Sequence, residues 1–522
     1  MPVNLYMKFF DKNNGWGSTM KESKRVIKNI IEFVIFIGII ALIFSKVTWI
    51  FRSNNRENRE NILGFKNQGN VDVVVYGNSS ILRGYQPLEA YNSKGFTSYN
   101  YATTNETANL LTFFIRESRT SNEASLYVVD IRAFVSVHDV IYEPSIRNWS
   151  DTVAVFSPIR IMGITSYLFS KNWEEYDVVP FYFDIAEYHS VYDALADPYQ
   201  WSYINTNNIY NVDKSFNAVV ENIPFTRPEI SDERGELTKT QLYRLNELLD
   251  YCDKEELPVL FIVSPCVITM SDWKSLNTCG DIIQERGYDF INVNNCYDEI
   301  GFDFETDFYD MVHLNYLGSE KFTKYLMNYI SDNYSLPDHR GDENYLNWDN
   351  DYNTFALLQE SWREDNVSLV EQHLKIKELG ESFHHIDDFS TWFESVQDEN
   401  FTIVIVKNQC ETYDTDDLAF NTMLLRWGID TAQPNYIGIW QGERNLFSTN
   451  DDSYEGEVGL IKRGYTIPCM VNTGENPQIS VDDIDYFNNL PGIQILVIDN
   501  NYRRVVDNVN VYVDESGVHF TR

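Results

Sequence analysis

The stretch Val71-Asp-Val-Val-Val-Tyr-Gly-Asn-Ser-Ser80 decides the fold class of the central part of the chain. Its valines and tyrosine form a short run that ends at Gly77, a pattern typical of a strand buried in a parallel sheet. Further runs of the same kind follow at residues 125–130, 258–264 and 290–293. We therefore expect residues 71–76 to be the first strand of a sheet and to end in a tight turn.

Helical patterns alternate with these strands. Residues 237–253 place leucines on one face at helical spacing, and residues 317–330 also have a helical pattern. Strands that alternate with helices predict a parallel sheet with helices on both faces. We expect this three-layer α/β domain to cover residues 71–335, with an aromatic-rich insertion or lid at 138–230.

The pattern changes towards the C-terminus. Residues 336–374 are acidic and are expected to form a connector. Beyond it, residues 401–406 and 492–498 have strong strand patterns, while residues 418–427 have a helical one. We expect a second, smaller, β-rich and sandwich-like domain at residues 375–522.

An apolar run of 22 residues, 30–51, stands near the N-terminus and is interrupted only by Glu32, Ser45, Lys46 and Thr48. The hydrocarbon core of a bilayer needs about 20 residues of helix, so residues 29–51 predict one transmembrane helix that remains as a signal anchor. A cleaved signal peptide is the alternative, but the apolar run is long for one and no small-x-small cleavage site follows it.

The basic side chains Lys21, Lys24, Arg25 and Lys28 precede this run. The positive-inside rule then places residues 1–28 in the cytoplasm as a tail and the rest of the chain outside the cell membrane. Residues 52–70 begin with a polar segment and are expected to be a stalk.

Composition limits the classes of function. The 522 residues include 78 acidic and 41 basic ones, a formal net charge of −37, which argues against nucleic acid as a partner. The six cysteines and eight histidines have no metal-binding spacing, so we expect neither a metal nor a cofactor. The cysteines could pair outside the cytosol, but their spacing assigns no disulfide.

Two short motifs carry chemistry. The first strand ends in Gly77-Asn-Ser79, and near the end of the domain stands Asp310-Met-Val-His313. An aspartate three residues before a histidine can orient the imidazole, which is then free to deprotonate a serine. Each motif alone is more often an ordinary turn, but their order along an α/β domain predicts a Ser-His-Asp site.

These motifs resemble those of the SGNH/GDSL hydrolase superfamily over roughly residues 71–348. The likeness is to membrane-anchored members that serve cell-envelope polymers, either in polysaccharide O-acetylation or as D-alanine transfer proteins. It rests on the 71–80 stretch, on Tyr99-Asn-Tyr-Ala-Thr-Thr-Asn105, on Tyr188-His-Ser190, and on Phe308-Tyr-Asp-Met-Val-His-Leu-Asn315 with Asp338-His-Arg340 downstream.

The resemblance implies catalytic roles. Ser79 matches the nucleophile, with Ser80 as the alternative, while His313 matches the general base and Asp310 its orienting acid. Further oxyanion or substrate contacts are expected among Ala102, Thr103, Asn105, His189 and Asn315. Two of these residues have an alternative interpretation. His189 could be a packed structural side chain, and Asn315 could cap or brace the loop of His313.

The chain also departs from the superfamily. Ala102 stands where relatives usually have glycine, Ser80 stands where a histidine usually follows the nucleophile, and no Gly-x-Asn-Asp block is evident. The third oxyanion donor is therefore not identified by sequence. Asp130, which ends the second strand pattern, fits a turn-capping carboxylate better than a cleft residue.

The C-terminal part is similar to the interleukin-like EMT inducer domain, over about residues 385–515. The likeness rests on Asp416-Asp-Leu-Ala at a helix start and on Gly492-Ile-Gln-Ile-Leu-Val-Ile498, although the order of motifs is altered. The resemblance implies a compact β-rich sandwich that binds carbohydrate. Trp427, Tyr436 and Trp440 could stack on sugars, or they could simply fill the core of this domain.

Three functions follow as hypotheses. The favoured one is a membrane-anchored extracytoplasmic O-acyltransferase or acylesterase that modifies a polysaccharide through an acyl-Ser79 intermediate. An integral membrane O-acyltransferase would supply the acyl group as a partner. The alternatives are a plain carbohydrate deacetylase or esterase, and a non-catalytic scaffold that keeps the fold.

Overall fold

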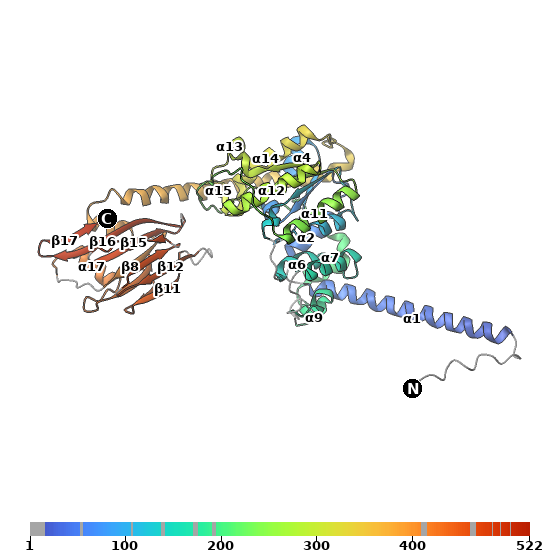
Figure 1. Ribbon diagram of the computed structural model, residues 1–522, viewed down its shortest axis with the longest axis horizontal. Coiled ribbons are helices and arrows are strands. Elements are labelled where there is room, and N and C mark those ends of the chain that lie inside the picture. Colours follow the sequence, from blue (N-terminus) through green and yellow to red (C-terminus); the bar gives the residue numbers. More distant parts are fainter. Residues whose placement is uncertain are drawn as a thin grey trace.

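The computed structural model describes residues 16–52, 56–105, 108–136, 141–170, 176–190, 195–408, 415–459, 466–474, 476–482, 484–490, 492–501 and 503–522. Figure 1 shows a long N-terminal helix, a first domain, a long connecting helix and a β-rich C-terminal region. The expected α/β fold with an apolar N-terminal helix and a β-rich second region is confirmed at this level.

The first domain is built on a parallel sheet of five strands in the order β2-β1-β3-β4-β5. All residues of its first four strands are buried, as expected where both faces of a parallel sheet are covered. The strands are β1 Val73–Gly77, β2 Ser98–Ala102, β3 Leu126–Asp130, β4 Val259–Val263 and β5 Asp289–Asn292.

Two groups of helices pack on this sheet. One contains α3 Ser79–Gly84, α4 Pro87–Lys94 and α14 Tyr316–Asn333, and the other contains α5 Leu111–Ser118 and α11 Lys239–Lys254. The predicted strands and helices at 237–253 and 317–330 are confirmed to within a few residues. The remaining short elements are η1 Arg132–Ser136, α12 Met270–Glu285, η5 Val293–Cys296, α13 Tyr297–Ile300, β6 Phe308–Asp310 and β7 His313–Leu314.

The order 2-1-3-4-5 reverses direction between β1 and β3. In open α/β sheets the ligand lies outside the carboxyl ends of the strands at such a reversal. Ser79 follows β1 directly and Arg132 follows β3, so the topology points to this place on the sheet as the site.

The insertion between β3 and β4 contains short helices. They gather around the C-terminal end of the N-terminal helix α1, where α9, α10 and η4 contact it (Figure 1). The elements are α6 Glu143–Ser150, α7 Pro158–Phe169, α8 Val179–Tyr182, α9 Asp184–Tyr188, α10 Pro198–Ser202 and η4 Tyr203–Asn208.

Helix α1 runs from Trp16 to Phe51 and is long and apolar enough from Lys24 onward to cross a membrane. The expected stalk is wrong, because residues Arg56–Phe65 form helix α2 and most of them are buried. Helix α2 packs on β2, where the Tyr99 hydroxyl donates to the Asn61 carbonyl at 2.6 Å. The segment folds as a helix and not as a stalk because one side of it is apolar. That side places Ile62, Leu63 and Phe65 in the core.

The expected connector is also more than a linker. After η6 Glu343–Tyr345, residues Leu346–Phe383 form one continuous helix, α15. Its first half places Trp348 and Phe355 in the core of the first domain, and its last turns place Ile376 and Phe383 in the core of the second. Helix α15 therefore belongs to both domains.

Within the described residues, the C-terminal domain has two antiparallel sheets and two helices, α16 Phe389–Ser395 and α17 Leu418–Arg426. Along β8, Ile403 and Ile405 face the helices while Val404 and Val406 face the smaller sheet, as the two-residue period of a strand requires. The larger sheet has the order β10-β9-β8-β15-β16-β17, made of β8 Phe401–Lys407, β9 Tyr436–Gln441, β10 Arg444–Thr449, β15 Ile493–Asp499, β16 Arg504–Asp514 and β17 Gly517–Thr521. The smaller has β11 Ser453–Val458, β12 Ile467–Asn472, β13 Gln478–Val481 and β14 Ile484–Asp485.

Candidate active site

Ser79 lies at the sharp turn between β1 and α3. Asn78 is the N-cap of α3, and its side chain accepts a hydrogen bond from the backbone N–H of Ser80 at 2.9 Å. A Cβ on Gly77 would stand 2.5 Å from Ile81 Cγ1 and 3.1 Å from Asp130 Cβ, so a glycine is required there. The turn leaves the Ser79 side chain partly exposed at the end of the sheet.

Asp310 and His313 come from the tight hairpin of β6 and β7. The Asp310 Oδ1 atom accepts backbone N–H bonds from Val312 at 2.8 Å and from His313 at 2.9 Å, which closes the turn. The same carboxylate lies 2.9 and 2.8 Å from His313 Nδ1. One turn therefore fixes both residues and the tilt of the imidazole.

The other ring nitrogen, His313 Nε2, lies 2.6 Å from Ser79 Oγ. The hydrogen-bonded chain from Ser79 to His313 to Asp310 predicted from the two motifs is thus present in the structure. In this arrangement the Asp310 carboxylate holds the proton on Nδ1, which leaves Nε2 free to accept the Ser79 proton.

Electrostatics favour a neutral imidazole. Burial lowers the pKa of His313 below its usual value, Arg83 and Arg132 lower it further, and Asp310 opposes them. Burial by itself raises the pKa of Asp310, but the bond from His313 and the backbone N–H groups outweigh burial and hold that pKa below its usual value. At neutral pH the pair is therefore a neutral base beside an ionised acid.

Ser80 has a different environment. Its hydroxyl donates to the Val312 carbonyl at 2.7 Å and accepts a bond from Arg132 Nη2, and its side chain is buried. Of the two serines, it is Ser79 whose hydroxyl contacts His313. Ser80 instead ties the turn after β1 to the hairpin that carries His313.

Arg132 is the residue that sequence reasoning missed. It stands just after β3, and its Nη2 atom also donates to Asn78 Oδ1 at 3.0 Å. Its Nε atom is buried and has no hydrogen-bond partner within the described residues. The signal that could have found it is its position at the carboxyl end of the strand next to β1, where the reversal in strand order places ligands.

The segment after β2 also reaches this edge of the sheet. Ala102 pairs with Gly77 in the β1–β2 register, so it lies beside the turn that carries Ser79. Thr103 is fully buried, and its hydroxyl has no hydrogen-bond partner among the described residues. Asn105 is exposed and has a φ of 56°, in the left-handed region.

The other two predicted residues have different places. Asn315 is buried and caps α14, accepting from the Gly318 N–H at 3.1 Å and donating to the Thr306 carbonyl at 2.7 Å, so its capping interpretation is confirmed. His189 is exposed at the end of α9, where Nδ1 lies 2.8 Å from the Ala186 carbonyl. The structure does not bring His189 to Ser79, nor is it the packed structural histidine that was the alternative.

Asp130 is a capping carboxylate, as expected. It is buried and accepts bonds from the Ser264 hydroxyl at 2.7 Å, from the Ser264 N–H at 3.1 Å and from the Arg132 N–H at 3.1 Å. Burial raises the pKa of this carboxyl. Asp130 thereby joins the ends of β3 and β4 and fixes the backbone of Arg132.

In the described part of the chain, no cluster of three or more His, Cys, Asp or Glu residues is placed to hold a metal ion. Five cysteines in that part are free thiols, namely Cys252, Cys266, Cys279, Cys296 and Cys469, and Cys410 lies outside it.

Comparisons with protein-family models, with curated protein sequences and with solved structures return no match to this chain. The resemblances of both domains therefore remain predictions, and function is inferred from the geometry around Ser79.

Proposed function

We propose that this chain is a membrane-anchored, extracytoplasmic acyltransferase or acylesterase that modifies polysaccharide through an acyl-Ser79 intermediate. The observation that carries the proposal is the chain of contacts from Ser79 Oγ through both nitrogens of His313 to Asp310. A half-buried serine bonded to a neutral imidazole is what nucleophilic acyl transfer requires.

The chemistry follows from these contacts. Ser79 Oγ attacks the carbonyl carbon of an acyl donor while its proton moves to His313 Nε2, and Asp310 stabilises the imidazolium that forms. His313 then protonates the departing oxygen, and the acyl group stays on Ser79. In the second half, His313 takes a proton from an incoming hydroxyl as its oxygen attacks the acyl carbon. His313 then gives that proton to Ser79 Oγ as the bond from Oγ to the acyl group breaks, which restores the free enzyme.

Arg132 is the proposed charged donor of the oxyanion hole. The superfamily's asparagine block is absent, whereas the guanidinium of Arg132 is anchored on the nucleophile turn through Asn78 and Ser80. A half-buried guanidinium at this place would stabilise the negative oxygen of the tetrahedral intermediate, and preorganised donors of this kind contribute strongly to catalysis.

A large groove supports a polymeric acceptor. It has a volume of about 1070 Å³ and lies between the two domains, with Met311 of the catalytic hairpin in its wall. The first domain also contributes residues 223–227 and 302–305, and the second contributes 466–468, 482, 503 and 504. A groove of this size beside the turn of His313 suits an extended chain better than a small ester.

The C-terminal domain enters this proposal through that groove. The three aromatic residues suggested for sugar stacking do not form an exposed platform for a sugar. Trp427 and Tyr436 are buried in the core of the domain, and Trp440 packs against that core. The alternative that they fill the core is the one the structure supports. The role proposed for the domain is therefore to form one wall of the groove.

The membrane part of the proposal rests on α1. Its basic N-terminal flank favours a cytoplasmic N-terminus, which leaves the catalytic domain outside. An enzyme fixed at that surface can receive acyl groups from an integral membrane O-acyltransferase, which is the proposed partner. A plain esterase differs only in using water as the acceptor.

The test uses the full-length protein in lipid nanodiscs with a chromogenic acetyl ester as donor and cell-envelope polysaccharide fragments as acceptors. We expect mass spectrometry to find acetyl on Ser79 and then on the acceptor, with neither in Ser79→Ala. Acetate release without acceptor labelling would replace the transferase with the esterase. If Ser79 is unlabelled and turnover equals that of Ser79→Ala, both the transferase and the esterase are excluded. The non-catalytic scaffold is then the remaining hypothesis.

A further inference from the structure

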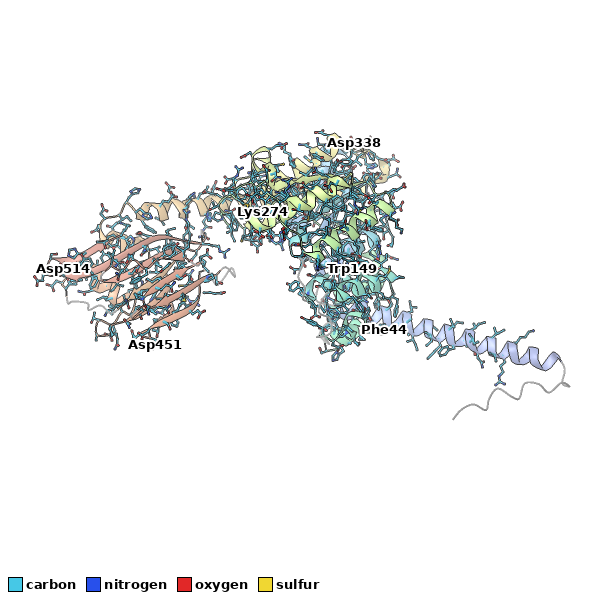
Figure 2. All side chains as sticks on the ribbon, viewed as in Figure 1. Phe44, Trp149, Lys274, Asp338, Asp451 and Asp514 are labelled. Atoms are coloured by element: carbon cyan, nitrogen blue, oxygen red, sulfur yellow. The ribbon has the colours of Figure 1, made fainter. Side chains whose placement is uncertain are left out.

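The end of α1 is enclosed by the first domain. Trp49 is buried with Leu63, Tyr203 and Ile209 in a small apolar cluster of its own. One turn and a half earlier, the ring of Phe44 lies 6.1 Å from that of Phe156. Figure 2 labels Phe44 at the point where the helix meets the domain. The helix therefore does not leave the domain through a free linker.

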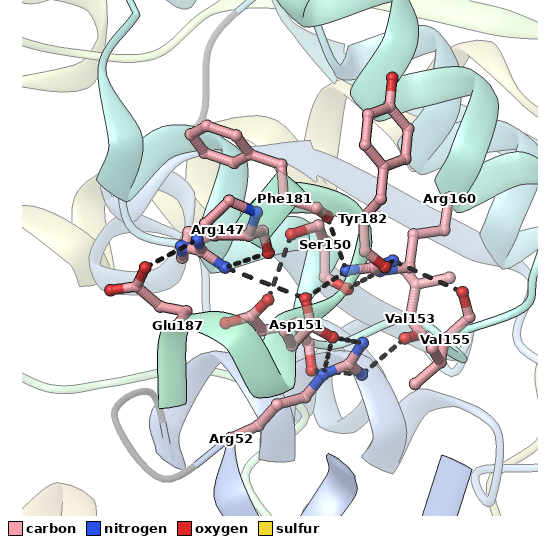
Figure 3. A network of polar contacts seen from close by, with 12 residues as sticks. Arg52, Arg147, Ser150, Asp151, Val153, Val155, Arg160, Phe181, Tyr182 and Glu187 are labelled. Carbon is pink, nitrogen blue, oxygen red and sulfur yellow. Dashed lines mark hydrogen bonds and ion pairs between the residues drawn. The ribbon is translucent and has the colours of Figure 1, made fainter. Parts of the chain in front are cut away.

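A buried charge network fastens this junction (Figure 3). The Arg52 guanidinium, one residue after α1, donates to Asp184 Oδ2 at 2.8 and 2.5 Å and to the carbonyls of Asp151 and Val153 at 3.1 and 2.8 Å. Arg160 donates to the other oxygen of Asp184 at 2.5 Å. The side chains of Arg52, Asp184 and Arg160 are all fully buried.

A second arginine ties α2 to the same place. Arg59 donates to the Trp49 carbonyl at 2.6 Å and to Gln200 Oε1 at 3.1 Å, and its guanidinium carbon lies 3.4 Å from the ring centroid of Tyr203. Burial lowers the pKa of Arg59 to about 10, so it keeps its charge at neutral pH. Helices α1 and α2 and the insertion thus form one rigid junction.

This junction fixes the height of the domain above the bilayer. The exposed part of α1 that follows its basic N-terminal flank runs from Ile30 to Ile43, before the half-buried residues 44–47, and fourteen residues of helix extend about 21 Å. A hydrocarbon core is about 30 Å thick, so the exposed part falls short by about 9 Å. Snorkelling of Lys28, which pairs with Glu32 at 3.6 Å, covers only part of this difference.

The surface around the junction exposes several large apolar side chains. Large side chains that are between 37% and 51% exposed stand on or beside the elements that contact α1. We name this set the collar, and it consists of Phe156, Phe183, Leu195, Trp201 and Ile204. Within the collar the Trp201 indole donates to the Leu195 carbonyl at 3.0 Å, and the Lys46 ammonium of α1 donates to the Ile204 carbonyl.

We infer that the collar is seated in the outer leaflet of the bilayer, in the interfacial layer and the upper acyl chains. The shortfall in the exposed length of α1 is then filled by the domain itself, and the amphipathic Trp201 lies at the depth that tryptophan prefers. The occupant of the collar is lipid. This inference rests on the proposed anchoring by α1 and is independent of chemistry at Ser79.

The test places the photocrosslinking residue p-benzoyl-phenylalanine at four positions of the full-length protein in lipid vesicles. Phe156 and Trp201 report on the collar, and Phe36, which is 58% exposed on α1, reports on anchoring. Leu425 on α17, 85% exposed in the C-terminal domain, is the water-facing control. We expect lipid adducts at Phe36, Phe156 and Trp201, at least about tenfold more than at Leu425.

Each other outcome overturns the inference. Lipid adducts at Phe36 with none at Phe156 and Trp201 would leave the anchor in place and remove the collar from the membrane. Adducts of Phe156 or Trp201 to a membrane protein, in cell membranes, would assign the collar to a protein partner. No adduct at Phe36 would remove the anchor and the collar together, while acyl transfer at Ser79 would still be measured separately.

Discussion

Two polar clusters in the first domain each pair an aspartate with a basic side chain, but they serve different purposes. At the junction with α1, Asp184 is shared between Arg52 and Arg160, and all three side chains are fully buried. At the end of the sheet, Asp310 contacts His313, which contacts Ser79, and all three remain partly exposed. The first cluster binds parts of the chain together and the second can move a proton.

The difference lies in what can titrate. Arginine keeps its proton at any pH that proteins meet, so the junction holds fixed charges and has nothing to transfer. Burial raises the pKa of Asp184, and Arg52 and Arg160 oppose that rise. Histidine changes charge near neutral pH, and the environment of His313 keeps it neutral and basic. Under the proposed function, Asp184 is structural and Asp310 is catalytic because of the base that each one faces.

The largest expected effect is a loss of activity when the cluster of Ser79, His313 and Asp310 is broken. Ser79→Ala removes the nucleophile, and we expect turnover of a chromogenic acetyl ester to fall at least about 10³-fold, because removing a member of such a triad has costs of this order. Labelling by a serine-directed phosphonate measures the same loss. Ser80→Ala is the matched control, and full activity in Ser79→Ala with loss in Ser80→Ala would reverse the assignment.

The next largest effect is a loss of stability when the junction cluster is broken. Asp184→Asn leaves two buried guanidinium groups without a carboxylate, and breaking a buried pair in this way costs about 3–5 kcal/mol. We expect hydrogen exchange in α6 to α10 to speed up by the corresponding factor. The control is Asp298→Asn, which breaks the exposed pair with Arg227 and should leave hydrogen exchange in α6 to α10 unchanged, because solvent screens such pairs. Equal exchange in the two variants would show that the junction network is not structural.

The third prediction concerns Arg132, the proposed donor to the oxyanion beside Ser79. Arg132→Ala should lower kcat about 10²–10³-fold with little change in KM, because an oxyanion donor acts in the transition state. Steady-state kinetics on the acetyl ester measure the two constants separately. A raised KM with an unchanged kcat would instead make Arg132 a substrate-binding residue.

The smallest effect is a shift in pH dependence. His313 must be neutral to accept the Ser79 proton, so activity falls as the pH drops through its pKa. Arg83 lowers that pKa, since a nearby cation disfavours the imidazolium. Arg83→Gln should therefore move the acid limb of kcat/KM to higher pH, while Arg340→Gln at a distant exposed site should leave it in place. A shift to lower pH would contradict the assigned base.

Much of the central sheet could be predicted because its strands are short, continuous apolar runs. β1, β3, β4 and β5 were predicted from such runs, whereas β2, Ser98–Ala102, contains serine, asparagine and two tyrosines and was not predicted as a strand. Some of its polar groups bond to residues far along the chain, such as the Asn100 N–H to the Lys214 carbonyl at 3.2 Å. A pattern read locally has no access to such partners.

The candidate site shows the same division. Asp310 and His313 lie three residues apart, so one turn places both and the motif could be recognised from sequence. His189 was selected from the resemblance alone, and the structure leaves it exposed on α9. Arg132 was missed because an arginine after a strand is ordinarily a solvated side chain.

The sequence by itself determined the α/β class of the first domain, the apolar N-terminal helix and the residues of the Ser79 chain. These features depend on local composition or on short motifs. The tertiary structure decided that residues 52–70 are not a stalk, that α15 is shared by two cores, and that Arg52 is buried. The physical reason is that an arginine can leave water only where partners converge on it, and Asp184 comes from 132 residues away.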